Sequence, residues 1–371
     1  MHFAVRHQSA DDMRARLLVA LAAGFAIVLG SPYTGQVRGA IQASLPDQYR
    51  LVVGGLVVGA VAVAIGVALL RIRDHRAQRY GAIAAAVAGG AIYAALTSTG
   101  NADVDVVERF HFVEYGVLTW LFYRVWRARA DVTALLFPAL AAVIVGTVDE
   151  GFQWLVPARV GELHDVLLNG AAIACGLVFS VGLDGATAVT AFPNRHGRRA
   201  LAWFLSAAIL TLALFVYAVH LGHEVRDVDG WFLSRYSADD LRKASRDRMT
   251  QWRSDPPRVL RRLSIEDHYL AEGLWHIQRR NEVKGFDAWK ENLILEKYFA
   301  PVLEVPTYAT PSGAKWPPEQ RQAMAAAVGN DARPFISTAN PYPIYLWNTA
   351  AFWGVVSALV AFVVGILAPG R

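Results

Sequence analysis

Residues 51–70, LVVGGLVVGAVAVAIGVALL, form an unbroken apolar run of 20 residues between Arg50 and Arg71. A helix rises about 1.5 Å per residue, so a run of this length covers the roughly 30 Å of hydrocarbon in a bilayer. No charged residue, amide or proline interrupts it. The run therefore predicts a transmembrane helix.

The rest of the chain has the same character. Of its 371 residues, 54% are hydrophobic and 18% are charged, and the mean hydropathy is +0.30. These values exclude an ordinary soluble enzyme of this size. The predicted fold class is an all-α polytopic membrane protein with about eight transmembrane helices, at residues 13–32, 51–70, 80–96, 107–123, 132–148, 166–183, 201–221 and 344–367. The first could instead be a cleaved signal peptide, but Gly30 and its neighbours lack a small-x-small cleavage pattern, which favours a helix.

Arginines mark every second connection between the expected spans. They precede the first span and follow the second, fourth and sixth: Arg6, Arg14 and Arg16; Arg71, Arg73, Arg76 and Arg79; Arg124, Arg127 and Arg129; Arg195, Arg198 and Arg199. Basic connections stay in the cytoplasm, so both termini are expected there. The net charge of +5 reflects this orientation, and we expect no nucleic-acid partner.

The chain divides by composition into four parts. A transmembrane domain is expected at 1–183, a basic loop with the seventh span at 184–222, a soluble segment at 223–343 and a last span at 344–371. All five lysines fall within 223–343, which the topology places outside the cytoplasm. The lone Cys175 cannot form an internal disulfide, so that segment must fold without one.

The soluble segment is expected to be small and mostly helical, with irregular connections. Ser237 and Ser264 each stand three residues before an acid, the pattern of a capped helix start. Helices are also expected over 286–299 and 317–328. The segment holds five tryptophans, which either fill its core or form a contact surface for another protein. They are Trp231, Trp252, Trp275, Trp289 and Trp316.

Polar side chains gather at the expected outer ends of the fourth, fifth and sixth spans. Such groups are costly within a membrane and usually mark a working site. The candidate ligand-binding cluster is His111, Glu114, Tyr115, Asp149, Glu150, Gln153, Arg159, Asp165 and Asn169.

The spacing of these residues supports a cluster. His111, Glu114 and Tyr115 share one helix face. Asp149 and Glu150 are expected at the end of the fifth span, where the helix dipole disfavours carboxylates. Arg159 is the nearest counter-charge, and Asp165 also suits an N-cap of the sixth span.

Familiar catalytic motifs are missing. The sequence has no Gly-x-Ser-x-Gly and no His-Glu-x-x-His. His220, His223 and Glu224 are metal-ligand types, but their spacing matches no known site. We therefore expect neither a metal nor another cofactor, and the sequence leaves open whether the protein is an enzyme.

The run Asp149-Glu150-x-x-Gln153-x-x-x-Pro157-x-Arg159, followed by Asp165-x-x-x-Asn169, resembles the VanZ-like family, which is named for a teicoplanin-resistance protein. His111-Phe112-x-x-Tyr115 is similar to the same family's pattern. The resemblance covers about residues 13–183. At one position the chain departs from it, since Glu108 stands where the family often has lysine. The resemblance implies a bacterial cytoplasmic membrane protein that acts at the cell envelope.

Two functions follow from these observations. In the first, the polar cluster forms an outer-leaflet pocket for a lipid headgroup or lipid-linked ligand. In the second, the bundle is a non-catalytic anchor, and residues 223–343 dock it onto a larger respiratory or photosynthetic complex. The expected partners are thus membrane lipids, with other subunits as the alternative.

Overall fold

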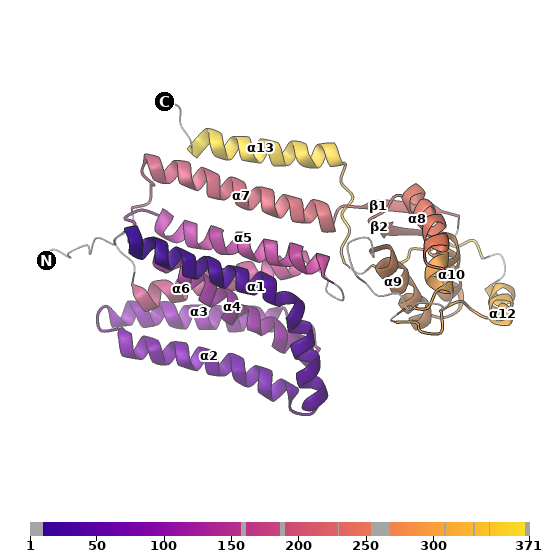
Figure 1. The fold of residues 1–371 in the computed structure, drawn as a ribbon, viewed down its shortest axis with the longest axis horizontal. Helices are drawn as coiled ribbons and strands as arrows, with labels where there is room; N and C mark the ends of the chain where they lie inside the picture. Colours follow the sequence, from indigo (N-terminus) through magenta and orange to yellow (C-terminus); the bar gives the residue numbers. More distant parts are fainter. Residues whose placement is uncertain are drawn as a thin grey trace. The chain divides into compact units, whose positions relative to one another are not determined.

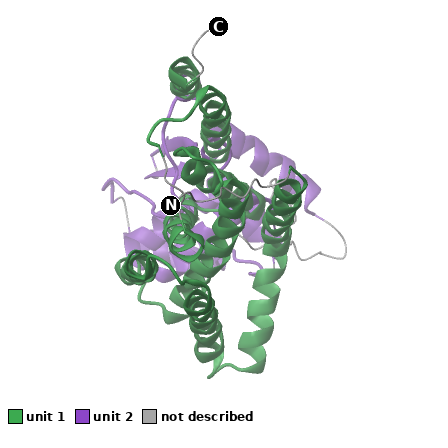
Figure 2. Ribbon diagram, turned by 90° about the vertical axis from the view of Figure 1, so that its left-hand side faces the viewer, with its two compact units in different colours: residues 1–153, 161–215, 353–371 green, residues 154–160, 216–352 purple. Residues whose placement is uncertain are grey.

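The computed structural model describes residues 10–156, 161–185, 190–228, 230–253, 268–307, 309–328, 331–340 and 342–367. They belong to two compact units, coloured green and purple in Figure 2. The first unit is Met1–Gln153, Gly161–Phe215 and Trp353–Arg371, and the second is Trp154–Val160 and Val216–Phe352. The expected soluble segment, 223–343, falls within the second unit.

Long helices make up the first unit and lie side by side (Figure 1). They are α1 (Ala10–Ser44), α2 (Tyr49–Arg71), α3 (Arg76–Leu96), α4 (Ala102–Trp126), α5 (Thr133–Leu155), α6 (Leu163–Asp184), most of α7 (Arg195–Val219) and most of α13 (Thr349–Leu367). Among the described residues, seven helices are long and apolar enough to cross a membrane. This confirms the prediction of a helical, multi-pass membrane protein.

One of the eight expected spans, α4, differs from the others in composition. It has 25 residues, which is long enough, but it carries acids such as Asp103, Glu108 and Glu114 and is not among the seven apolar helices. It packs against α1, α2, α3 and α6. Surrounded in this way, a helix can place polar side chains against protein instead of lipid.

Two helices end well beyond the spans expected from apolarity. The first span was predicted to end at Pro32, and a proline within a helix removes an N–H donor and usually kinks it. Instead, α1 continues through Pro32 to Ser44. The fifth span was predicted to end at residue 148, but α5 continues to Leu155. Helix ends therefore do not coincide with the ends of the apolar runs.

The core of the first unit lies where α1, α4, α5 and α6 meet. It is formed by Ala20, Tyr115, Leu118, Phe122, Ala141, Ala142, Ala172 and Ile173. At the crossing of α4 and α6, a Cβ on Gly176 would lie 2.7 Å from the Cα of Gly116. Membrane helices associate through small residues that let their backbones approach, and this glycine pair sets that approach.

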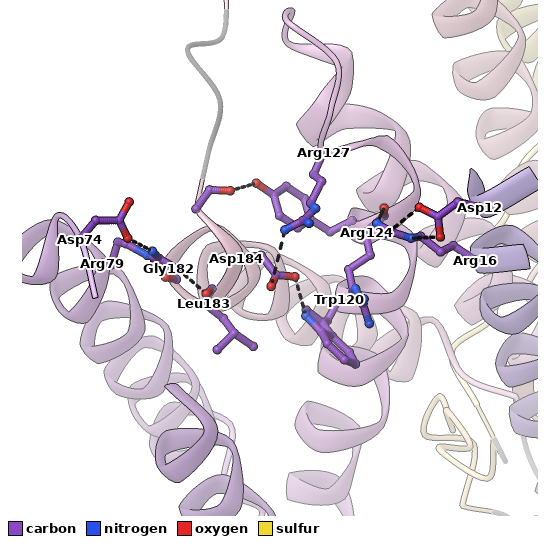
Figure 3. Close-up of polar contacts among 12 residues, drawn as sticks. Asp12, Arg16, Asp74, Arg79, Trp120, Arg124, Arg127, Gly182, Leu183 and Asp184 are labelled. Carbon is purple, nitrogen blue, oxygen red and sulfur yellow. Dashed lines mark hydrogen bonds and ion pairs between the residues drawn. The ribbon is translucent and has the colours of Figure 1, made fainter. Parts of the chain in front are cut away.

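Polar contacts join α3, α4 and α6 at the C-terminal end of α6 (Figure 3). Arg79 of α3 donates from Nε to the carbonyl oxygen of Gly182 at 2.8 Å and also contacts the carbonyl of Leu183. Trp120 of α4 donates from Nε1 to Asp184 at 3.0 Å. A cation at the last carbonyls of a helix satisfies groups that have no partner inside it. These contacts tie α3, α4 and α6 together.

The second unit combines a β-hairpin with short helices. Strands β1 (His223–Asp227) and β2 (Gly230–Ser234) pair antiparallel, with Val225 opposite Phe232. The helices are α8 (Ala238–Gln251), α9 (His268–Glu282), α10 (Gly285–Tyr298), α11 (Ala300–Glu304) and α12 (Pro318–Val328). Their buried core includes Val225, Phe232, Leu241, Tyr269, Leu295 and Phe299.

Several sequence predictions can be compared with this unit. Ser237 caps α8 and accepts a hydrogen bond from the amide of Asp240 at 3.2 Å, as predicted. Helices α10 and α12 confirm the helices expected at 286–299 and 317–328. The expected helix start at Ser264–Asp267 lies outside the described residues. The hairpin was not predicted.

The five tryptophans do not form the centre of this core. Four are half-buried, and Trp275 has 39% of its surface exposed. Four lie beneath arginine side chains at 5.0–5.8 Å, in the pairs Arg226–Trp231, Arg248–Trp252, Arg280–Trp316 and Arg321–Trp289. They therefore flank the core, which tyrosine, phenylalanine and aliphatic residues fill.

One face of α9 carries a buried polar row that the sequence reasoning missed. His268, Glu272, His276 and Arg280 follow each other at intervals of four residues, and each is at most 4% exposed. His276 Nδ1 lies 2.7 Å from Glu291, and Arg280 Nη1 donates to Asn292 at 3.0 Å. Buried polar groups persist when they are hydrogen-bonded, and these are.

Candidate functional site

The candidate site begins with a buried floor between α4 and α5. Tyr115 Oη donates to Asp149 Oδ2 at 3.1 Å. Gln153 Nε2 donates to Asp149 Oδ2 and to Glu150 Oε1, both at 3.0 Å. All four side chains are at most 3% exposed. Two adjacent carboxylates are thus held within the bundle by a phenol and an amide.

A second layer joins α4 to α6. His111 Nδ1 lies 2.9 Å from Asn169 Oδ1. An amide oxygen only accepts, so Nδ1 carries the proton in this arrangement. The imidazole also stacks on Tyr115, with ring centroids 6.0 Å apart and planes 3° apart. The second layer therefore rests directly on the floor.

Gly146 of α5 makes room for both layers. A Cβ at this position would lie 3.1 Å from the Tyr115 ring and 3.4 Å from Asn169 Nδ2. Asn169 is 1% exposed, and its Nδ2 has no hydrogen-bond partner among the described residues. A buried donor of this kind is rare and indicates a place where a further group can bind.

An acidic rim lies one helical turn above the second layer. Glu108 precedes His111 by three residues on α4, and Asp165 precedes Asn169 by four on α6, so each rim residue shares a face with the residue below it. Glu108 interacts electrostatically with Asp165 and His164, and Glu162 interacts with all three. Glu108, Glu162 and Asp165 are half-buried, and His164 is exposed. The rim is the accessible part of the site.

The helix ends set the depth of the floor. Asp149 precedes the end of α5 at Leu155 by six residues, and Asn169 follows the start of α6 at Leu163 by six, so both lie about 9 Å inside the bundle. The prediction that Asp149 and Glu150 end the helix was wrong. Because α5 continues past them, Gln153 stabilises them one turn along the same helix, and the terminal dipole has little effect there.

Asp165, Glu114 and Arg159 complete the set of predicted site residues. Asp165 was a candidate N-cap, but Glu162 occupies that position and Asp165 lies in the first turn of α6. Glu114 is half-buried on α4 beside Tyr115. Arg159 lies outside the described residues. Glu162 was missed, although its charge next to the start of an apolar helix was a usable signal.

The histidines at the end of α7 take part in structural contacts. His220 Nδ1 donates to the carbonyl oxygen of Pro343 at 2.8 Å, and His223 begins strand β1. Throughout the described part of the chain, no group of three or more histidine, cysteine or acidic residues has the arrangement of a metal site.

Comparison with known proteins identifies no relative, because no family model, no curated protein and no solved structure matches this chain. The resemblance to the VanZ-like family therefore remains a prediction from the residues quoted for it. The site consists of a half-buried acidic rim above two buried carboxylates.

Proposed function

We propose that this chain is a VanZ-like protein of the bacterial cytoplasmic membrane that acts at the cell envelope by binding an ammonium-bearing headgroup of a lipid or lipid-linked molecule. The arginine distribution supports an extracytoplasmic rim, with both termini in the cytoplasm. The soluble segment, 223–343, is then extracytoplasmic as well. The ligand would enter from the outer leaflet.

The observation that carries the proposal is the concentration of acids at one end of three helices. Glu108, Glu162 and Asp165 line the rim, and Asp149 and Glu150 lie below them. In a low-dielectric environment, carboxylates attract a cation far more strongly than in water. An ammonium at the rim would offset the repulsion between these acids. A phosphate alone would increase it.

His111 supports a site that recognises hydrogen-bonding groups as well as charge. It is half-buried between rim and floor and is oriented by Asn169 and Tyr115. A histidine next to carboxylates is also the equipment of acid–base chemistry. Binding is the function that the geometry supports best.

The test is a binding comparison with two lipids that share acyl chains. The purified full-length protein is titrated with dioleoyl phosphatidylethanolamine or dioleoyl phosphatidylglycerol and followed by native mass spectrometry. We expect the binding that depends on Asp149 and Glu150 to be at least tenfold tighter for the amine lipid. Asp149→Asn and Glu150→Gln should each reduce that preference.

A matched control is Asp11→Asn, which removes an exposed acid from the first turn of α1 and should leave the preference unchanged. Equal loss of both lipids on substitution of Asp149 and Glu150 would refute the proposal. So would a preference that survives in both Asp149→Asn and Glu150→Gln.

A second candidate function is that of an accessory subunit. It is favoured by apolar side chains exposed on the second unit, among them Trp275 at 39% and Ile336 at 51%. Native gels of mildly solubilised membranes test it. Co-migration with stoichiometric partners that is lost on deleting residues 223–343 would support a subunit, whereas migration as a monomer or dimer would exclude it.

A further inference from the structure

A large apolar cavity lies on the other side of α4 from the acidic site. Its volume is about 680 Å³, and α2, α3, α4 and α6 form its walls. Representative wall residues are Val61, Ala64, Ala91, Val113 and Phe179. All of them belong to the first unit. The cavity is therefore a feature of the membrane bundle itself.

Small side chains explain why the space is open. Ala60, Ala64, Ala91 and Ala94 line it on α2 and α3. On α4, a Cβ at Gly116 would have no atom within 4 Å, so this glycine exposes bare backbone to the space. Larger side chains at these positions would fill it. A cavity lined by apolar groups does not favour water, so an apolar occupant suits it.

The cavity has the dimensions of a lipid chain. Along α2 its wall runs from Val57 to Arg71, which are 14 residues or about 21 Å apart. One leaflet of a bilayer contributes about 15 Å of hydrocarbon, half of the total. The long direction of the space follows the helices, as acyl chains do in a membrane. The wall is therefore long enough for one acyl chain of a single leaflet.

Basic residues are clustered at one end of the cavity. Arg71 lines the end next to the connection between α2 and α3, where exposed Arg73 lies in the connection and exposed Arg76 begins α3. Arg79 is already engaged by Asp74 and by the end of α6 (Figure 3). At the other end, Arg109 is the lining cation. Basic clusters where helices meet the membrane surface bind anionic headgroups.

We propose that this cavity is a binding site for one acyl chain of an anionic phospholipid, with Arg71 bound to the phosphate. The site goes beyond the proposed function, because it lies on different faces of the bundle and selects the opposite headgroup charge. The lipid would fill the gap between α2 and the α4–α6 pair. Its chain lies against Gly116, Cys175 and Phe179.

Filling the cavity tests the proposal. The full-length protein and variants are titrated with dioleoyl phosphatidylglycerol and the bound lipid is counted by native mass spectrometry. Ala64→Leu, which projects into the cavity, and Arg71→Gln should each lower retention at least fivefold. Ala62→Leu is the matched control, since Ala62 is exposed on the same helix and is not among the lining residues.

Cys175 gives an independent readout in the wild-type protein, because it lines the cavity and is the only cysteine of the chain. Phosphatidylglycerol should slow its modification by a maleimide. Retention in Ala64→Leu and Arg71→Gln equal to that of wild type would overturn the proposal. Protection of Cys175 that increases with protein concentration, and not with lipid concentration, would also overturn it. That result would indicate that a second copy of the protein covers the cavity. Asp149→Asn should leave these results unchanged, which separates them from the proposed function.

Discussion

Replacing Gly176 with alanine should separate α4 from α6. The new Cβ would lie 2.7 Å from the Cα and 3.2 Å from the carbonyl oxygen of Gly116. Ordinary contact begins at about 3.4 Å, so the two backbones must move apart by about 0.7 Å. No flexible side chain can rotate away, because the contact is with backbone.

The expected cost follows from two opposing effects. Overpacking a tight contact costs about 1–3 kcal/mol. Alanine favours a helix over glycine by about 1 kcal/mol, which offsets part of that cost. We expect Gly176→Ala to lower the free energy of unfolding by about 1–2 kcal/mol.

Two variants control for the effect of alanine itself. Gly170 lies on the same helix, and a Cβ there would have no atom within 4 Å. Gly116 is the other member of the crossing, and its Cβ would likewise meet nothing within 4 Å. Gly170→Ala and Gly116→Ala should therefore be neutral or slightly stabilising.

The assay is detergent-dependent unfolding, combined with the rate at which a maleimide modifies Cys175, the residue before Gly176. Opening of the crossing should speed this reaction in Gly176→Ala only. If Gly176→Ala matches Gly170→Ala in both stability and labelling, the inferred close approach of the two helices is wrong.

Three further changes have expected outcomes. Gln153→Leu removes hydrogen bonds to both buried carboxylates and should destabilise the bundle by about 2–3 kcal/mol in detergent unfolding, whereas Gln36→Leu, at an exposed position of α1, should have little effect. Burial raises the pKa of Glu272 despite hydrogen bonds from Ser234 and the Arg235 amide, so its contribution to stability is complete below the unfolded pKa and is lost as pH rises. Glu272→Gln should remove that loss and slow hydrogen exchange in α9 at pH 8 relative to wild type. Burial also raises the pKa of Asp227, but Lys297, Tyr298 and the Val228 amide outweigh it and lower the pKa overall. Its stabilisation is therefore present at neutral pH and lost in acid, and Asp227→Asn should cost about 0.5–1.5 kcal/mol at pH 7 and little near pH 3, measured by exchange in β1.

The transmembrane helices could be predicted because a bilayer accepts few alternatives. Runs such as 51–70 have the required length and apolarity, and α2 begins and ends within two residues of that run. The ends of α1 and α5 could not be predicted in this way. The extension of α5 carries Asp149, Glu150 and Gln153, which are buried and hydrogen-bonded, whereas most of α1 beyond Pro32 is exposed.

The candidate site was predicted in its residues but not in its contacts. Helical spacing placed His111 and Tyr115 on one face of α4, and they do stack. The contact of Tyr115 with Asp149 depends on how α4 packs against α5, and one sequence does not give that packing. The role of Gly146 was missed for the same reason, since a glycine in an apolar run carries no sign of what approaches it.

In the second unit, local signals were more informative than long-range ones. The Ser237 cap is encoded within four residues and was predicted. The hairpin was missed even though Asp-Gly at residues 229 and 230 is a hairpin signal. The polar row on α9 resembles a solvent-exposed helix face in sequence, and only its partners on neighbouring elements make it buried.

The most direct test of the acidic site is a protection experiment at its rim. His164 is exposed beside Glu108, Glu162 and Asp165, so His164→Cys in a Cys175→Ala background places a single thiol there. Dioleoyl phosphatidylethanolamine should slow maleimide modification of this thiol, dioleoyl phosphatidylglycerol should not, and adding Asp149→Asn should abolish the protection. Modification at the same rate with either lipid, or with none, would contradict a site for an ammonium-bearing headgroup at this position.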